Sequence, residues 1–242
     1  MIDPSSSLPG LRITVTGGTS GLGLALVEIL RRGGAKVAFL ARRGDRVREV
    51  ARDNPGTHGI VGDVAQKNET YVLAGSILAA LGGLDVLIHN ASTLGPVPLA
   101  LLADTECEDF ETALATNLIG PFRLTKALLG ALAASAREGR PALIIHVVSD
   151  AAVTPYPGWG AYGASKAALL HLSRIWDEEL RPHGLRVQAI DPGDMDTPLH
   201  ALAVPDADRA SLRRPETSAR EIVAHIEEHF HAGRDHTRAT SV

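Results

Sequence analysis

The sequence predicts an α/β protein built on a doubly wound parallel sheet (Rossmann fold), with about six strands, helices on both faces and a single domain. A chain of 242 residues, 45% of them hydrophobic, suits one large domain with a sizeable core. Short apolar runs rich in β-branched residues alternate with longer segments of helical periodicity. The short runs are almost continuously apolar, which is typical of strands covered on both faces.

Each element follows from these patterns. The apolar runs bounded by turn residues predict strands at residues 11–16, 36–41, 59–61, 84–89, 142–149 and 185–190. The helical periodicity predicts helices at residues 22–32, 46–52, 66–81, 105–136, 161–181 and 216–230. Because crossovers between parallel strands are right-handed, ligands are expected at the carboxyl ends of the strands.

Five of the six predicted strands end in polar or glycine residues. These residues are the turn from Gly17 to Gly23, Asp63, Asn90, Ser149 and the pair Pro192-Gly193. They are therefore expected to converge on one cleft. Beyond Gly193, residues 194–215 lack long periodic apolar runs and are expected to form a substrate lid, whereas residues 232–242 are expected to be a disordered tail.

The glycine-rich turn after the first strand has the spacing Gly17-x-x-x-Gly21-x-Gly23, which differs from the usual G-x-G-x-x-G fingerprint. Gly17 permits a sharp turn, and Gly21 and Gly23 permit close approach of backbone to a pyrophosphate. Thr19 and Ser20 add hydroxyl donors at the helix N-terminus, which attracts phosphate. A turn of this kind can also be purely structural.

The second strand ends in Ala41-Arg42-Arg43, with no acidic residue in the turn. An acidic residue at this place would hold the ribose hydroxyls of NAD, whereas an arginine suits the 2′-phosphate of NADP. NADP(H) is therefore favoured over NAD(H). The alternative is that Arg42 and Arg43 only solvate the start of a helix, and Asp45 could reverse the preference.

Tyr162 and Lys166 are separated by four residues in a predicted helix, so both side chains lie on one face. A phenol, with an ordinary pKa of about 10, needs a neighbour that favours the phenolate if it is to act near neutral pH. Lys166 can supply that charge, and Ser149 offers a second hydroxyl. In isolation, such a pair is in most cases simply two surface residues of an amphipathic helix, and the accompanying motifs favour the catalytic interpretation.

Taken together, these motifs resemble the short-chain dehydrogenase/reductase family, in its compact single-domain branch, from about residue 11 to 230. The matching residues are Thr16 to Gly23, His89-Asn-Ala-Ser92, Asn117, Ser149, Tyr162 to Lys166, and Pro192-Gly193 through Thr197.

The resemblance implies a role for each residue. Tyr162 would be the catalytic acid/base, Lys166 would lower its pKa and bind the nicotinamide ribose, Ser149 would hold the substrate carbonyl, and Asn117 would support a proton-relay water. No metal is implied. The implied cofactor-binding residues are Gly17, Thr19, Ser20, Gly21, Leu22, Gly23, Arg42, Arg43, Asp63, Val64, Asn90, Ala91, Ser92, Tyr162, Lys166, Pro192, Gly193, Met195 and Thr197.

The chain departs from the family pattern in three places. His89 and Ser92 replace the first Asn and the Gly of the NNAG motif, and Asp150 follows Ser149. The chain also ends after the helix at 216–230, where many relatives add a strand that helps to build tetramers. The resemblance therefore implies a homodimer through the helices at 105–136 and 161–181, and not a tetramer.

Composition excludes several other classes of partner. The net charge of −4 is spread along the chain, which argues against nucleic acid or an anionic membrane. No apolar run reaches the roughly 20 residues that cross a bilayer. The lone Cys107 and the absence of a secretion signal favour the cytoplasm. His225-Ile-Glu-Glu-His229 matches a zinc-protease pattern formally, but a solvated helix face is the better interpretation.

The sequence thus predicts an NADP(H)-dependent oxidoreductase that transfers hydride between the nicotinamide and a small or medium organic carbonyl or alcohol. The alternative is a non-catalytic NADP(H)-binding sensor or scaffold of the same fold. A sugar-nucleotide epimerase or dehydratase is disfavoured by the short length and the glycine spacing.

Overall fold

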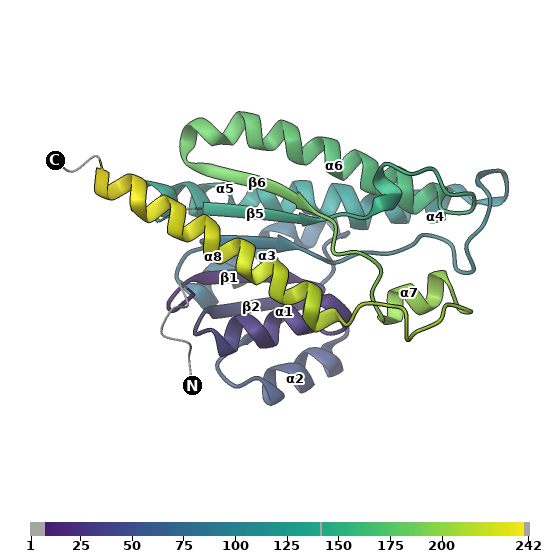
Figure 1. Cartoon of the computed structure of the whole chain (residues 1–242), viewed down its shortest axis with the longest axis horizontal. Coiled ribbons are helices and arrows are strands. Elements are labelled where there is room, and N and C mark those ends of the chain that lie inside the picture. Colours follow the sequence, from purple (N-terminus) through teal and green to yellow (C-terminus); the bar gives the residue numbers. More distant parts are fainter. Residues whose placement is uncertain (1–7, 141, 240–242) are drawn as a thin grey trace.

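The computed structural model describes residues 8–140 and 142–239, with side chains described as far as His231. Its centre is one parallel sheet of six strands, as the sequence predicts, and the strand order is β3-β2-β1-β4-β5-β6 (Figure 1). The strands are β1 (Arg12–Thr16), β2 (Lys36–Ala41), β3 (His58–Val61), β4 (Val86–His89), β5 (Ala142–Val147) and β6 (Leu185–Ile190).

Helices cover both faces of this sheet (Figure 1). They are α1 (Gly21–Arg32), α2 (Gly44–Asp53), α3 (Thr70–Leu81), α4 (Cys107–Leu114), α5 (Gly120–Arg137), α6 (Gly160–Leu180), α7 (Pro198–Ala203) and α8 (Pro215–Ala239). α1, α2 and α8 pack on one face, and α3, α5 and α6 pack on the other. Within the described residues, no helix has the length and apolar character needed to span a membrane.

The alternation of side chains along each strand builds the two halves of the core. In β2, Val37 and Phe39 join the apolar cluster under α1 and α8, whereas Ala38 and Leu40 join the cluster under α3 and α5. Successive strand residues point to opposite faces, so a strand must be apolar throughout to fill both clusters. This explains why the strands are continuous apolar runs in the sequence.

The predicted helix at residues 105–136 is divided in the structure. α4 ends at Leu114, a π-helical turn covers Ala115–Ile119, and α5 begins at Gly120. Pro121 has no backbone N–H and therefore cannot continue the regular hydrogen-bond pattern. Gly120 also packs closely on the chain after β3, since a Cβ atom there would lie 2.7 Å from the carbonyl oxygen of Val64. The break places Asn117 inside the π-helical turn.

The segment 194–215 is more regular than its sequence suggests, because it contains the short helix α7. The hydroxyl of Thr197 caps this helix by accepting a hydrogen bond from the His200 N–H at 3.2 Å, and Pro198 occupies its first position. Met195 pairs with Arg213 in a parallel bridge that closes the segment at its base. Helical periodicity could not reveal a helix of six residues.

α8 is longer than the predicted helix at 216–230, because it continues to Ala239. The expected disordered tail at 232–242 thus begins within this helix, and its last three residues, 240–242, lie outside the described residues. No proline interrupts the segment, and the single Gly233 costs about 1 kcal/mol relative to alanine, which a long helix tolerates.

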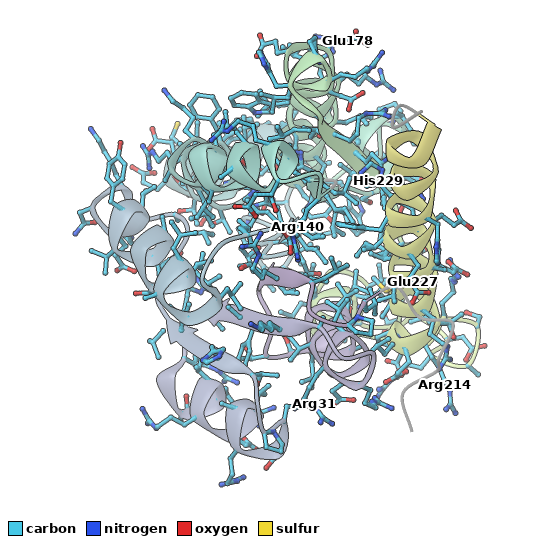
Figure 2. All side chains as sticks on the ribbon, turned by 90° about the vertical axis from the view of Figure 1, so that its left-hand side faces the viewer. Arg31, Arg140, Glu178, Arg214, Glu227 and His229 are labelled. Carbon is cyan, nitrogen blue, oxygen red and sulfur yellow. The ribbon has the colours of Figure 1, made fainter. Side chains whose placement is uncertain are left out.

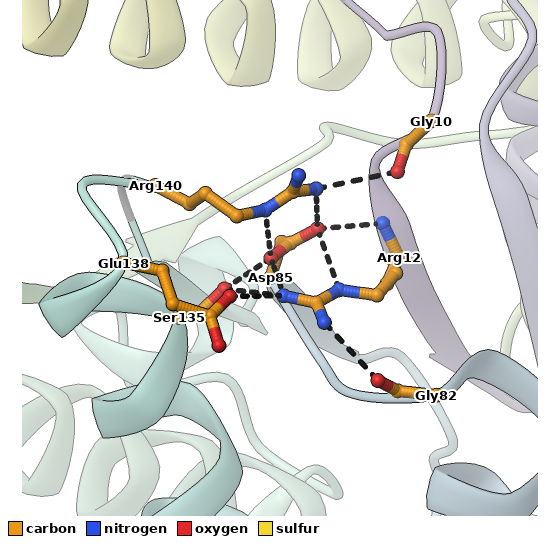
Figure 3. Close-up of polar contacts among 7 residues, drawn as sticks. All are labelled: Gly10, Arg12, Gly82, Asp85, Ser135, Glu138 and Arg140. Carbon is orange, nitrogen blue, oxygen red and sulfur yellow. Dashed lines mark hydrogen bonds and ion pairs between the residues drawn. The ribbon is translucent and has the colours of Figure 1, made fainter.

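A buried carboxylate ties together the edge of the sheet where the strands begin. Asp85 is fully buried, and Arg12 and Arg140 approach its two carboxylate oxygens at 2.7 and 2.6 Å (Figure 3). Ser135 of α5 also donates a hydrogen bond to it. Figure 2 looks onto this edge and shows Arg140 near its middle, with α8 along one side. This network secures the sheet at the end opposite to the exits of the strands.

Candidate active site

The glycine turn between β1 and α1 leaves a cradle next to the helix N-terminus. Gly17 and Gly21 have positive φ angles of 72° and 50°, and a Cβ atom on Gly23 would lie 2.2 Å from the Gly17 carbonyl oxygen. Ser20 caps α1 with its backbone only, since its side chain makes no capping hydrogen bond. The N–H groups of the first turn therefore remain available for an anion, and the cradle fits a pyrophosphate.

Asn90 fixes the end of β4 against the end of β1. Its side-chain amide donates to the Thr16 carbonyl at 2.9 Å, and the Thr16 hydroxyl accepts hydrogen bonds from the N–H groups of Asn90 and Ala91, each at 3.0 Å. Thr197 comes from the far end of the sequence to contact Gly21, where a Cβ atom would lie 3.0 Å from its methyl carbon. The glycine turn and the exit of β4 thus lie together, as predicted for strand exits, and the start of α7, which was not predicted, joins them.

Two arginines lie at the end of β2. The side chains of Arg42 and Arg43 are exposed, and neither makes a hydrogen bond or ion pair with the part of the chain that the structure describes. Arg42 borders a hollow of about 370 Å³ that is also lined by Asp63 and Val72. This hollow lies at the carboxyl ends of β2 and β3, where a dinucleotide-binding fold of this kind would hold the adenosine.

Tyr162 and Lys166 project from the first two turns of α6 and are nearly buried, with exposed fractions of 8% and 2%. The Lys166 ammonium nitrogen lies 5.5 Å from the centre of the Tyr162 ring and donates a hydrogen bond to the Val147 carbonyl at 2.8 Å. The spacing of four residues therefore brings the two side chains together beside the end of β5.

Burial dominates the acidity of both groups. It raises the pKa of Tyr162 to about 12, against smaller lowering effects of hydrogen bonds to Ser149 and Ser92. It lowers the pKa of Lys166 to about 8. In the protein alone, both side chains are thus displaced toward their neutral forms, because a desolvated site disfavours charge.

Ser149 follows β5 and points at a neighbouring carboxylate. Its hydroxyl donates to Asp150 Oδ1 at 2.9 Å and accepts a hydrogen bond from the Ala151 N–H at 3.2 Å. The Tyr156 hydroxyl donates to the other oxygen, Asp150 Oδ2, at 2.7 Å. These hydrogen bonds, that of Tyr156 first, lower the pKa of Asp150 and keep it ionised.

Asn117 is fully buried and joins the exit of β4 to α6. Its carbonyl oxygen accepts hydrogen bonds from the Thr93 N–H at 2.9 Å and from the Ser92 hydroxyl at 3.1 Å. Its amide nitrogen donates to the Thr93 carbonyl at 2.8 Å and to the Ser165 hydroxyl at 2.9 Å. Sequence reasoning missed Thr93 and Ser165; the position of Ser165 beside Lys166 is the only local signal.

His89, the unusual residue before Asn90, lies behind this site. Its ring is 5.0 Å from that of His146 on β5, and its Nε2 lies 2.9 Å from the Thr125 hydroxyl. Burial lowers the pKa of both histidines, to about 3 for His146, so both are neutral. His89 thus fills the core between β4 and α5 and does not face the cleft.

An apolar wall flanks the phenol of Tyr162. Leu94 and Ala151 are buried against it, and Leu99, Trp159, Leu199 and Ala203 pack around them. Leu199 and Ala203 belong to α7, so the segment 194–215 closes over the Tyr162 side of the cleft. Met195 instead packs against the core cluster under α1 and α8.

Pro192 and Gly193 form the turn after β6. The Pro192 carbonyl accepts hydrogen bonds from Ser218 at 2.8 Å and from Arg213 at 3.2 Å, and Gly193 has a φ angle of 74°. Among the side chains that the structure describes, no three His, Cys, Asp or Glu residues cluster as a metal site would require. His225 pairs with Gln188 on β6.

The fold and this cleft define a protein that binds a dinucleotide where parallel strands end, next to a paired tyrosine and lysine. Comparison with known proteins shows which family of dinucleotide-binding proteins this is. The family model described as short chain dehydrogenase matches residues 12–208. The 2,5-dichloro-2,5-cyclohexadiene-1,4-diol dehydrogenase of Sphingobium indicum is 33% identical over 195 residues, which cover 80% of this chain and 76% of that protein.

Solved structures agree. A short chain dehydrogenase from Salmonella enterica superposes with a TM-score of 0.84 at 26% identity and covers 92% of each chain. A Shigella flexneri structure complexed with NADP gives a TM-score of 0.81 at 27% identity and covers 88% of this chain and 89% of that one. The chain belongs to the short-chain dehydrogenase/reductase family. It is an oxidoreductase that acts on alcohol or carbonyl groups with a nicotinamide dinucleotide.

Proposed function

We propose that this protein is an NADP(H)-dependent oxidoreductase that moves a hydride between the nicotinamide and a small or medium organic carbonyl or alcohol, with Tyr162 as general acid/base. The observation that carries the proposal is the approach of Lys166 to the Tyr162 ring, at 5.5 Å, in a buried corner of the cleft. If Tyr162 and Lys166 were ordinary surface residues of a helix, both side chains would be exposed to solvent, whereas here both are nearly buried.

Tyr162 donates the proton that the reduced carbonyl oxygen requires. A developing alkoxide is a much stronger base than a phenolate, so a phenol whose pKa is raised to about 12 remains protonated and still transfers its proton readily. When bound, the nicotinamide supplies the hydride. Ser149 adds a second hydroxyl for the oxygen on which charge develops. The protein alone is therefore set for reduction.

Lys166 and Asn117 act behind the phenol. The Lys166 ammonium is held in place by the Val147 carbonyl at 2.8 Å, and it would bind the nicotinamide ribose. Asn117 fixes Thr93 and Ser165, and through them the exit of β4 and the first turns of α6. In this proposal Asn117 supports the proton path by holding the backbone around Lys166.

The preference for NADP(H) is supported by Arg42 and Arg43. Both side chains are without a hydrogen-bond or ion-pair partner among the described residues, and Arg42 lines the hollow at the end of β2. A guanidinium binds phosphate through two parallel hydrogen bonds. The related Shigella flexneri structure contains NADP. Asp45 lies in the first turn of α2, where its carboxylate faces solvent.

We also propose that two copies associate through α5 and α6. Phe122 and Ile175 are 37% and 43% exposed on these helices, and the Phe122 and Trp176 rings stack at 6.0 Å. Such an apolar patch on neighbouring long helices suits a two-fold interface.

One experiment tests activity and cofactor choice together. The absorbance of NADPH and of NADH is followed while the purified protein is offered a library of carbonyls, and the oxidised cofactors are offered with the corresponding alcohols. Consumption of NADPH in preference to NADH is expected. Retained NADPH binding without turnover across the whole library would instead favour a cofactor sensor or scaffold.

A further inference from the structure

The hydroxyl of Ser149 donates its hydrogen bond to the neighbouring carboxylate of Asp150 in this structure. A serine hydroxyl has one proton to donate, and that of Ser149 goes to Asp150 Oδ1 at 2.9 Å. A hydrogen bond to a carboxylate is stronger than one between neutral groups. A substrate oxygen therefore has to compete with Asp150 for the proton of Ser149, unless something else occupies the carboxylate.

Asp150 has no cationic partner. Its carboxylate is exposed and accepts hydrogen bonds from the neutral hydroxyls of Ser149 and Tyr156, and it forms no ion pair with any described residue. Two arginines of the nearby segment are engaged elsewhere, since Arg209 pairs with Asp196 and Arg213 with Glu221. The carboxylate of Asp150 can therefore form an ion pair with a positively charged ligand.

The rest of this rim is also negative. Asp191 and Asp150 raise the pKa of Tyr162, and Asp194 and Asp150 raise that of Tyr156, which places all three carboxylates within electrostatic reach of the two phenols. The Nε2 atom of His200 lies 4.0 Å from Oδ1 of Asp194. These three carboxylates outnumber the buried ammonium of Lys166, which lies 5.5 Å from the Tyr162 ring, so the charge around the two phenols favours a positive ligand.

Aromatic rings stand beside Asp150. The Tyr156 and Trp159 rings lie 6.4 Å apart, and Trp159 meets the edge of Tyr162 at 5.8 Å. A carboxylate next to aromatic rings is a common arrangement for binding an ammonium group, which is attracted to both. Leu94, Leu99 and Leu199 complete the site with an apolar wall.

We propose that the substrate carries an ammonium group on a carbon next to, or one removed from, the reacting carbon, and that Asp150 binds it. The inference rests on the proposed function and names its substrate class: amino alcohols and the corresponding amino ketones. The spacing follows from the site, because Ser149 Oγ and Asp150 Oδ1 are 2.9 Å apart. An oxygen and a nitrogen on neighbouring carbons can reach both at once.

Binding of the ammonium group also releases Ser149. Once the carboxylate is neutralised by a full positive charge, the serine hydroxyl loses little by turning to the substrate oxygen. In the oxidation direction, the carbinol carbon gives its hydride to the oxidised nicotinamide, its O–H proton passes to the Tyr162 phenolate, and a C=O bond forms. The ammonium keeps all its protons throughout.

A matched set of substrates tests the proposal. 1-Amino-2-propanol, 1,2-propanediol and lactate differ in charge at one position, and kcat/KM is measured for each with NADP⁺ near pH 8. The amino alcohol is expected to exceed the diol by about tenfold, because its ammonium group makes a charge-assisted hydrogen bond to Asp150, and lactate is expected to be slowest, because its carboxylate is repelled. Asp150→Asn should reduce the preference to within about twofold, whereas Asp104→Asn, which removes an exposed carboxylate elsewhere, should preserve it.

A binding measurement distinguishes ammonium binding by Asp150 from the oxidoreductase activity itself. The chain has two tryptophans, so Trp176→Phe leaves Trp159 as the only indole reporter. 1-Amino-2-propanol should change its fluorescence saturably, and Asp150→Asn should abolish the change. Equal responses to the amino alcohol and the diol, or equal kcat/KM values for them, would overturn this inference and leave the oxidoreductase intact. Binding that depends on Asp150, with no turnover of any carbonyl or alcohol, would overturn the proposed function instead.

Discussion

Ser92 Oγ lies 3.1 Å from Asn117 Oδ1, so the residue that replaces the family glycine after β4 is tied to the π-helical turn before α5. Burial raises the pKa of Tyr162, and a hydrogen bond from Ser92 to the phenolate opposes that rise. The Ser92 hydroxyl has one proton, so it must turn from Asn117 to the phenol when the phenolate forms, a contact that glycine cannot make.

Ser92→Ala should raise the pKa of Tyr162, because one hydroxyl that stabilises the phenolate is lost. The pH at which alcohol oxidation reaches half its maximal rate should therefore move upward, and kcat at a fixed neutral pH should fall about fivefold, which corresponds to about 1 kcal/mol for one hydrogen bond. KM should change little. Ser76→Ala, on the outer helix α3, is the control, and a pH profile unchanged by Ser92→Ala would refute the role.

Tyr162→Phe should lower kcat by about 10³-fold, which lies within the usual contribution of general acid/base catalysis. Cofactor affinity should change by less than about twofold, because the ring and its contact with Trp159 are retained. Single-turnover absorbance measurements check the fall in rate, and a cofactor titration checks the unchanged affinity. Tyr71→Phe is the control, since Tyr71 is 81% exposed on α3. An undiminished rate would exclude Tyr162 as the acid/base.

Arg42→Ala should weaken NADP(H) binding about 10- to 100-fold, because a hydrogen bond to a charged group contributes about 1.5–3 kcal/mol. NADH binding should hardly change, since NADH has no 2′-phosphate. Calorimetric titration with both cofactors measures the ratio. Arg48→Ala removes another exposed arginine of α2 and should leave the ratio as it is. An equal loss for both cofactors would mean that Arg42 does not recognise the phosphate.

The buried Lys166 ammonium should lower the free energy of unfolding at neutral pH. Its pKa is about 8 in the folded protein, against 10.5 for the free side chain, so the unfolded chain holds the extra proton between these two values. Stability should therefore rise with pH across this window, and the buried ammonium costs about 3 kcal/mol at pH 7.

Lys166→Met should accordingly raise the free energy of unfolding at pH 7 by about 2 kcal/mol, after a loss of about 1 kcal/mol for the Val147 carbonyl that it leaves unpaired. Turnover should be lost at the same time. Urea unfolding at pH 7 and pH 9.5 measures the effect, with Lys36→Met at an exposed position as the control. A variant that is less stable than the parent at both pH values would contradict this prediction.

Asp85→Asn should destabilise the fold by about 3 kcal/mol at pH 7, because it leaves Arg12 and Arg140 beside a neutral group in a buried network. Despite the opposing effect of burial, hydrogen bonds from Arg140, Arg12 and Ser135 hold the pKa of Asp85 well below its ordinary 3.8. The stability that it contributes is therefore complete above pH 3.8 and is lost as the pH falls below that value.

Thermal unfolding between pH 2 and pH 7 checks this, because the variant should lose part of the acid dependence that the parent shows. Asp53→Asn is the control: its carboxylate is 57% exposed, and its pair with Arg52 contributes little. Equal effects of the two substitutions would show that the network at the start of the strands carries no special stability.

The residues that sequence analysis brought together are those whose position follows from local rules. The exits of parallel strands lie at one edge of a sheet, so the sequence alone places Gly17, Asn90 and Ser149 near one another. The pairing of Tyr162 with Lys166 follows from the helical repeat alone.

Other contacts depend on how distant elements pack. Asn117 meets Thr93 and Ser165 only because a π-helical turn interrupts the predicted helix at 105–136. Asp85 meets Arg140 across 55 positions. α7 was missed because six residues are too few to show a period.

The sequence by itself thus determined the order of the elements, the family and the chemical groups proposed to face the cofactor, since these follow from short-range periodicity and from residue type. Only the tertiary structure decided how acidic those groups are and which neighbour holds each proton. Burial raises the pKa of Tyr162, and Asp150 takes the hydroxyl proton of Ser149. Both effects depend on desolvation and on distances in space, which the linear order of residues does not contain.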